Sequence, residues 1–128
     1  MADINLRGYT RYEVDLQYTQ QGTALCKFSL YDTPDGRYDQ RDNIVVWGEL
    51  AEACNMAIEI GDNLFIKGYR KTREFTTIQG EEKSYEQLVA KGLWLIDGDG
   101  KMNEVNMELG YTKLEEYREQ NGLDEYGC

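Results

Sequence analysis

Apolar and polar residues alternate along most of the first 97 residues, which is the pattern of strands that bury one face. The alternation predicts strands at 4–10 and at 25–31. A β-branched run at 44–47 predicts a third strand that is buried on both sides. Strand character returns at 63–78 and again at 83–97. Turn signals separate these segments at Gln21–Gly22, at Asp35–Gly36 and at 79–82.

One segment instead repeats its apolar residues at the spacing of a helix. The repeating residues are Leu50, Ala51, Cys54, Ala57 and Ile58, and the Gly61–Asp62 pair ends the segment. The predicted order is therefore three strands, one helix and a final hairpin. Five strands with one helix between the third and fourth strands is the layout of the OB-fold, a partly open all-β barrel. The sequence thus predicts an all-β chain with a five-stranded OB-fold barrel.

The alternating pattern fades after residue 97. The chain has 128 residues, enough for one domain, and we assign 1–97 to the barrel. Residues 98–128 are expected to form an acidic, largely flexible tail, in which Leu114, Tyr117 and Arg118 suggest at most a short surface helix. The net charge of the chain is −10, and this tail holds eight acidic residues against three basic ones. About half of the negative charge therefore lies outside the predicted barrel.

Cysteine and histidine content narrows the chemistry open to the chain. Histidine, the commonest general base near neutral pH, is absent, and the three cysteines are widely spaced. Neither a cysteine-rich zinc site nor a cysteine–histidine nucleophile can be assembled, so we expect no metal and no cofactor. Cys26 and Cys54 suit a core, and Cys128 suits an exposed thiol.

An enzyme is the weakest of the functional hypotheses. Acidic pairs such as Glu81–Glu82 and Glu115–Glu116 lie in turn and tail contexts, where a solvated face is the ordinary explanation. A glycine-rich phosphate loop of the GxxxxGK type does not occur. No apolar run approaches the length of about 20 residues that a membrane span needs, and the start of the chain lacks a signal pattern. We expect a cytoplasmic protein that does not engage a membrane.

Three motifs follow one another along most of 1–97. They are INLRGYTRYEVDLQYTQQGTALCKFSL at 4–30, VVWGELAE at 45–52 and GDNLFIKGYRKTREF at 61–75. Their order and spacing resemble the bacterial-type single-stranded DNA-binding proteins. The resemblance implies binding of single-stranded DNA without strong sequence preference, which protects it during replication, recombination and repair. Binding of this kind needs flat side chains for base stacking and a basic groove along the phosphates.

The resemblance implies three aromatic side chains that stack on bases. Trp47 stands where the family carries a stacking aromatic, and Phe75 matches a usual tryptophan directly after the basic RKTRE run. Tyr38, in the polar connection before the third strand, is the third candidate. The competing interpretation for Trp47 is a core residue that covers the helix, and the residues alone leave both open.

The tight cluster of Arg70, Lys71 and Arg73 stands out in an acidic chain, because phosphate affinity comes from lysine and arginine. Lys71 and Arg73 are two apart on a strand and so share a face, which Phe75 continues, whereas Arg70 lies on the other face. We expect further phosphate contacts from Arg37, Arg41, Arg7 and Lys83. For each of these cations the competing interpretation is an ordinary solvated surface charge.

Several residues depart from the family pattern. Glu49 replaces a common lysine, Glu74 replaces a polar or basic residue, and Arg41–Asp42 replaces an aromatic and a polar group. These changes remove positive charge and one stacking surface, so we expect binding that is weaker or more sensitive to salt than is usual in the family. They fit a divergent, phage-like or plasmid-like member.

The C-terminal residues and the first strand raise the question of protein partners. The chain does not end in the acidic Ile-Pro-Phe peptide by which family members dock replication and repair enzymes. Leu123, Asp124, Glu125 and Tyr126 form a possible divergent docking peptide, and the alternative is an unstructured solubilising end. Family members pair through the first strand, where Ile4 and Leu6 offer apolar side chains, so a homotetramer or a homodimer is expected.

Two other kinds of function are alternatives to binding of single-stranded DNA. The acidic surface of an OB-fold could bind a protein, as in a primosome-like adaptor with weak or no nucleic-acid binding. An RNA-binding role like that of cold-shock proteins is disfavoured, because the aromatic RNP-type strand motifs are missing.

Overall fold

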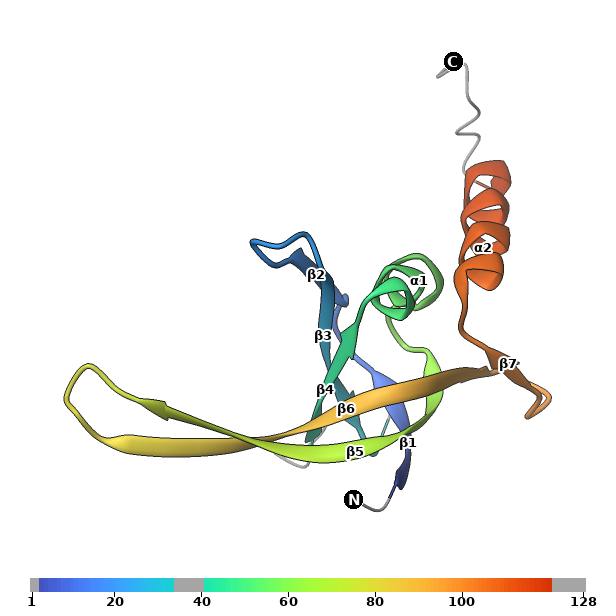
Figure 1. The fold of residues 1–128 in the computed structure, drawn as a ribbon. Coiled ribbons are helices and arrows are strands. Elements are labelled where there is room, and N and C mark those ends of the chain that lie inside the picture. The colour runs from blue at the N-terminus through green and yellow to red at the C-terminus, as the bar shows by residue number, and fades with distance from the viewer. Residues whose placement is uncertain (1–2, 34–40, 121–128) are drawn as a thin grey trace.

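The computed structural model describes residues 3–33 and 41–120 and shows a mostly β chain with two helices (Figure 1). The strands are β1 (Ile4–Thr10), β2 (Asp15–Tyr18), β3 (Ala24–Tyr31), β4 (Arg41–Trp47), β5 (Asn63–Thr76), β6 (Glu82–Ile96) and β7 (Met102–Glu104). The helices are α1 (Glu49–Ala57) and α2 (Met107–Gln120). Among these residues no helix is long and apolar enough to cross a membrane.

The strands close into a ring, which confirms the predicted all-β barrel of the OB class. Along the sheet the order is β1-β5-β6-β4-β3-β2, and β1 also pairs with β3 through Tyr9 and Thr10. At this closure the backbones of β1 and β3 come very close, because a Cβ placed on Gly8 would lie 2.6 Å from the carbonyl oxygen of Tyr31. Only glycine fits where the ring closes.

The core fills the ring and is covered by α1. In β3 the alternating residues Cys26, Phe28 and Leu30 are buried. In β4 the successive residues 44–46 are all buried, as expected for a strand covered on both sides, whereas Trp47 at its end is exposed. Helix α1 contributes its small residues, among them Ala53 and Cys54, to the same cluster. Cys26 and Cys54 are free thiols within this core, as their sequence context predicted.

The β5–β6 hairpin extends far beyond the ring, to the left in Figure 1. A bulge between Lys67 and Gly68 marks the point where β5 leaves the barrel. A Cβ on Gly68 would lie 2.0 Å from the carbonyl oxygen of Val89, so no other residue fits this bulge. The turn runs from Thr77 to Glu81, where the Thr77 and Glu81 backbones are hydrogen-bonded at 2.8 Å.

The described residues form seven strands and two helices, whereas the sequence pattern predicted five strands and one helix. Strand β2 is short, and only its Leu16 is partly buried, so it shows no usable alternation. Strand β7 has three residues, MNE, and pairs with the end of β6. Strand β7 is held by its pairing with β6, and β2 by its pairing with β3 together with Leu16, which packs against the core.

The segment after residue 97 contains more regular structure than the predicted flexible tail with at most a short helix. Helix α2 packs on α1 at Gly110, where an added Cβ would lie 3.0 Å from the Met56 side chain. Met107 and Leu109 pack against the core, and Val105 is fully buried. Packing against a neighbouring helix, which the sequence pattern does not reveal, holds this segment in place.

Candidate nucleic-acid interface

The outer face of the β5–β6 hairpin gathers cations and aromatic rings. The antiparallel register places Lys71 opposite Gln87, Arg73 opposite Tyr85, and Phe75 opposite Lys83. Directly opposed residues of an antiparallel pair project to the same face of the sheet. We call these six residues the basic–aromatic face.

The outer faces of β3 and β4 lie beside this hairpin. Cys26 and Val46, opposite each other, point into the core, so their neighbours Leu25 and Trp47 point outward. Trp47 is 38% exposed. Its side chain therefore belongs to the surface, and the interpretation of Trp47 as a core residue is wrong.

A groove joins the two surfaces. Its main section, about 550 Å³, is lined by Leu25, Lys27, Val45, Trp47, Arg73, Glu74, Phe75, Tyr85 and Gln87. A second section of about 320 Å³ shares four of these residues and continues along β3 and β4 to Ser29 and Asn43. The structure thus brings Trp47 of β4 together with Arg73 and Phe75 of β5, which lie more than 25 residues further along the chain.

The rings of the groove keep open surfaces. Phe75 is 45% exposed and Tyr85 is 43% exposed. Their ring centroids are 5.8 Å apart at an interplanar angle of 61°, an edge-to-face pair that holds both rings in place. With Trp47 on the opposite wall, the groove presents aromatic surfaces on both sides.

The cations of the basic–aromatic face have few polar partners. Arg73 donates from Nε to the Gln87 Oε1 atom at 3.3 Å. Within the described part of the chain, neither Lys71 nor Arg73 forms an ion pair. Lys83, nearer the turn, lies 3.9 Å from a carboxylate oxygen of Glu81. Two cations on this face are therefore free to meet an anion.

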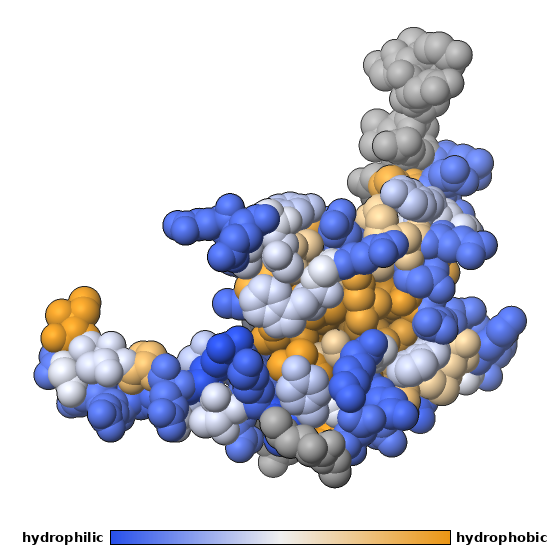
Figure 2. Space-filling model, in the orientation of Figure 1, coloured by the Kyte–Doolittle hydropathy of each residue, from blue (hydrophilic) through white to orange (hydrophobic). Residues whose placement is uncertain are grey.

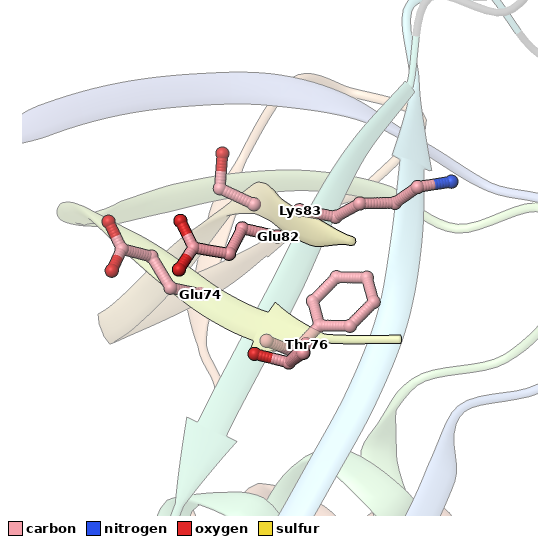
Figure 3. Close-up of a pocket in the computed structure, with 6 residues that line it drawn as sticks. Glu74, Thr76, Glu82 and Lys83 are labelled. Carbon is pink, nitrogen blue, oxygen red and sulfur yellow. The ribbon is translucent and has the colours of Figure 1, made fainter. Parts of the chain in front are cut away.

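The other face of the hairpin is acidic. The same register places Glu74, Glu82 and Glu86 there, because each is one residue removed from a member of the basic–aromatic face. Figure 3 shows the Glu74 and Glu82 side chains directed to one side of the hairpin and Lys83 to the other. The hairpin therefore separates opposite charges onto its two faces.

Arg70 lies on this acidic face, as its position in the strand predicted. Its guanidinium is 3.5 Å from Asp42 and 3.8 Å from Glu86. Arg70 is thus paired with carboxylates, whereas Lys71 and Arg73 on the other face are not.

The remaining predicted residues are less closely grouped. Arg41 begins β4, is exposed, and by alternation shares the outer face with Val45. Arg7 is exposed opposite Phe65 on the base of β5 and does not line the groove. Tyr38, Arg37, Leu123, Asp124, Glu125 and Tyr126 lie outside the described residues.

Three groove residues were missed in the sequence. Lys27 follows from the alternation of 25–31, since it shares a face with Leu25 and not with Cys26. Tyr85 and Gln87 could have been found by counting back from the 79–82 turn, which pairs them with Arg73 and Lys71. The register of the hairpin predicts both residues, whereas a run of basic residues does not point to them.

The described residues offer little for metal or thiol chemistry. They contain no group of three or more acidic or cysteine side chains placed to hold a metal ion. Burial, the largest cause, raises the pKa of the Cys26 thiol to about 12, and the Asp15 charge adds to the shift. Burial also raises the pKa of Cys54. Both thiols are therefore protonated near neutral pH and are poor nucleophiles.

Comparison with known proteins agrees with the family resemblance of the sequence motifs. The model of the Single-strand binding protein family matches residues 1–96. A Single-stranded DNA-binding protein of Xanthomonas axonopodis pv. citri (strain 306) is 27% identical over 106 residues, which cover 77% of this chain and 59% of that protein. A protein of the same name from Xanthomonas campestris pv. campestris is 26% identical over 106 residues, covering 77% and 62%. The chain spans about three fifths of the length of these curated relatives.

Proposed function

The chain belongs to the single-strand binding protein family, and from this premise we propose that it binds single-stranded DNA without strong sequence preference. The site is the groove between β3–β4 and the basic–aromatic face. The observation that carries the proposal is the presence, on one surface, of exposed rings at Trp47 and Phe75 and of unpaired cations at Lys71 and Arg73. Coating exposed strands in this way would protect them during replication, recombination and repair.

The expected role of each residue in binding follows from the chemistry of its side chain. Bases would stack on Trp47, Phe75 and Tyr85, and stacking contributes about 1–3 kcal/mol per base. Lys71, Arg73 and Lys27 would meet the phosphates, and Arg41 would extend this strip along β4. The predicted contacts from Arg37 and Tyr38 concern residues outside the described part of the chain and stay predictions. We propose binding and not catalysis, because the groove combines stacking surfaces with cations.

The net charge of −10 does not oppose this proposal. The acidic helix α2 lies at the end of the molecule opposite the hairpin tip (Figure 1). Charges separated by more than about 8–10 Å are largely screened at physiological ionic strength. A strand in the groove would therefore respond mainly to the cations beside it, and the remote acidic residues would favour solubility.

Tryptophan fluorescence tests the proposal directly. A Trp94→Phe background leaves Trp47 as the reporter, and titration with oligo-dT at low salt should quench it. The logarithm of the affinity should fall linearly with the logarithm of the salt concentration, by about 0.7 per phosphate neutralised. The Lys71→Ala/Arg73→Ala variant should lower this slope by roughly two such increments.

The matched control is Arg70→Ala, which removes a cation from the acidic face of the same strand and should leave the slope near that of the parent. Trp47→Ala lacks the reporter, so its affinity is measured with labelled oligo-dT and should fall. No response at low salt would overturn the proposal and favour the protein-binding adaptor. Parent-like binding by both groove variants would show that the groove is misplaced.

We also propose self-association through β1, as a dimer or a tetramer. Ile4 and Leu6 pack against the core of their own barrel, so the apolar edge expected from the sequence does not support the interface. The support is instead the backbone, because only Tyr9 and Thr10 of β1 pair with β3 among the described residues. Sedimentation analysis of the parent and of an Asn5→Pro variant, which loses one N–H donor, tests this interface; a monomeric parent would contradict it.

Two remaining expectations depend on the proposed function. Docking of replication or repair proteins by Leu123 to Tyr126 stays a prediction, tested by whether a variant shortened after Gln120 loses such partners. A cytoplasmic location, expected from the sequence, also stays a prediction.

A further inference from the structure

Gln87 is a polar residue almost completely buried in the floor of the groove. It is 7% exposed, and it lines both sections of the groove. Arg73 donates from Nε to its Oε1 atom at 3.3 Å. Because a guanidinium can only donate, the carbonyl oxygen of the Gln87 amide must face Arg73, and the NH₂ group must point elsewhere.

The NH₂ group of Gln87 has no hydrogen-bond partner within the described residues. The only fully buried side-chain nitrogen or oxygen without a partner there is Asn63 Oδ1. Gln87 keeps 7% of its surface exposed and lines both sections of the groove, so the groove is the open space beside its amide. An unpaired donor held by a buried side chain costs free energy unless a ligand or water accepts its hydrogen bond.

We propose that Gln87, with Arg73, gives the groove a preference for bases that carry a carbonyl oxygen where others carry an amino group. This inference rests on the proposed function. At the floor of the groove, Arg73 and Gln87 present hydrogen-bond donors, namely the N–H groups of Arg73 that Gln87 does not engage and the NH₂ group of Gln87. Thymine, uracil and guanine offer carbonyl acceptors to such a floor, whereas cytosine and adenine present an amino donor at the corresponding position.

The hydrogen bond to Arg73 also removes the usual way in which glutamine recognises adenine. That recognition is bidentate and needs the amide oxygen to accept a hydrogen bond from the adenine amino group. In this groove the oxygen is already engaged. The expected preference is modest, since one neutral hydrogen bond corresponds to about a fivefold change in affinity.

Oligo-dU and oligo-dC of equal length provide the sharpest test. Both are pyrimidine strands without a methyl group, and they differ at position 4 in a carbonyl against an amino group. The parent should bind oligo-dU about fivefold more tightly than oligo-dC. Gln87→Met, which keeps the side-chain volume and removes the amide donors, should lower the ratio, because only the N–H groups of Arg73 remain.

Two other variants separate base recognition from loss of fold or charge. Gln87→Glu keeps an oxygen for Arg73 and removes both donors, and its carboxylate can accept a hydrogen bond from the cytosine amino group. It should weaken binding to both strands and bring the ratio to one or below. Lys71→Met should weaken both strands and keep the ratio, because Lys71 lies opposite Gln87 but meets phosphates.

The outcomes distinguish this inference from the proposed function. Equal binding of the two strands by the parent, or a ratio that survives Gln87→Met and Gln87→Glu, would overturn the base preference and leave single-strand binding intact. Failure of the parent to bind either strand would overturn the proposed function itself.

Discussion

The ring of Phe75 meets the ring of Tyr85 edge to face, with centroids 5.8 Å apart, across the two strands of the extended hairpin. The two residues are diagonal neighbours, because Tyr85 lies directly opposite Arg73 and Phe75 opposite Lys83. The pair fixes two partly exposed rings beside a free guanidinium. An aromatic stacking surface and a positive charge therefore lie next to each other within one short stretch of the hairpin.

Tyr85→Ala should weaken binding of oligo-dT by about 1–3 kcal/mol, since it removes one stacking surface and also frees the Phe75 ring. Phe75→Ala should have a similar effect, and the double variant should lose less than the sum, because each single change disturbs the other ring. The measurement is titration with labelled oligo-dT at fixed salt. Tyr111→Ala, which removes a comparably exposed tyrosine from α2, is the matched control and should bind like the parent.

The groove shows which parts of a site a sequence can reveal. Trp47, Lys71, Arg73 and Phe75 were found because each stands in a motif or beside a run of charge. Their position on one surface follows from alternation in β4 and β5. Tyr85 was missed because its role depends on which residue of β5 it opposes, and that depends on the exact length of the Thr77–Glu81 turn.

The helix after residue 97 could not be predicted from the sequence for a different reason. Helix α2 meets α1 through Gly110, a residue that lowers helix propensity and contributes nothing to an apolar stripe. Gly110 permits this contact because it is small, and its small size matters only because Met56 of α1 packs against it. Sequence patterns report how much apolar surface a segment carries, whereas close approach of two backbones depends on the partner.

Gly110→Val should lower the free energy of unfolding by about 1–3 kcal/mol, because its Cβ alone would lie 3.0 Å from the Met56 side chain. Thermal unfolding measures this loss, and binding of oligo-dT should not change, since α2 lies far from the hairpin. Tyr111→Val places valine at an exposed position of the same helix, away from Met56, and is the matched control. Equal melting temperatures for the two variants would show that α2 does not depend on this contact.

Asp62 predicts a pH dependence of stability. Burial, the largest cause, raises its pKa above the ordinary value of 3.8, against the hydrogen bond from the Glu59 N–H at 2.7 Å and the Lys113 charge at 3.9 Å. A raised pKa in the folded state means that its contribution is fully present below 3.8 and is lost as the pH rises through the folded-state value. Asp62→Asn should therefore gain stability relative to the parent as the pH rises through this window, measured by urea unfolding at several pH values.

Asp97 is a control for this experiment, because its pKa is shifted in the opposite direction. The N–H of Lys101, the largest cause, donates to its carboxylate at 2.9 Å and lowers the pKa below 3.8. Its contribution is present above 3.8 and is lost as the pH falls through the lowered value. Asp97→Asn should therefore gain relative to the parent only as the pH falls, and identical pH profiles for the two variants would refute both assignments.

The acidic face of the hairpin should confine a bound strand to the basic–aromatic face. Neutralising it with Glu74→Gln, Glu82→Gln and Glu86→Gln would remove the repulsion and release Arg70 from one of its two carboxylate partners. We expect oligo-dT to bind about threefold more tightly to this triple variant, because each exposed charge has only a small effect. The number of nucleotides covered per chain, measured by titration with strands of increasing length, should also rise as the strand gains access to a second face.

The matched control neutralises three carboxylates of α2, with Glu108→Gln, Glu115→Gln and Glu116→Gln. It changes the net charge by the same amount at the end of the molecule remote from the hairpin (Figure 1), where Figure 2 shows α2 rimmed by hydrophilic residues. If net charge alone governed binding, the two triple variants would gain affinity equally and neither would cover more nucleotides. If position governs it, only the hairpin variant gains, because screening suppresses the distant charges at physiological salt.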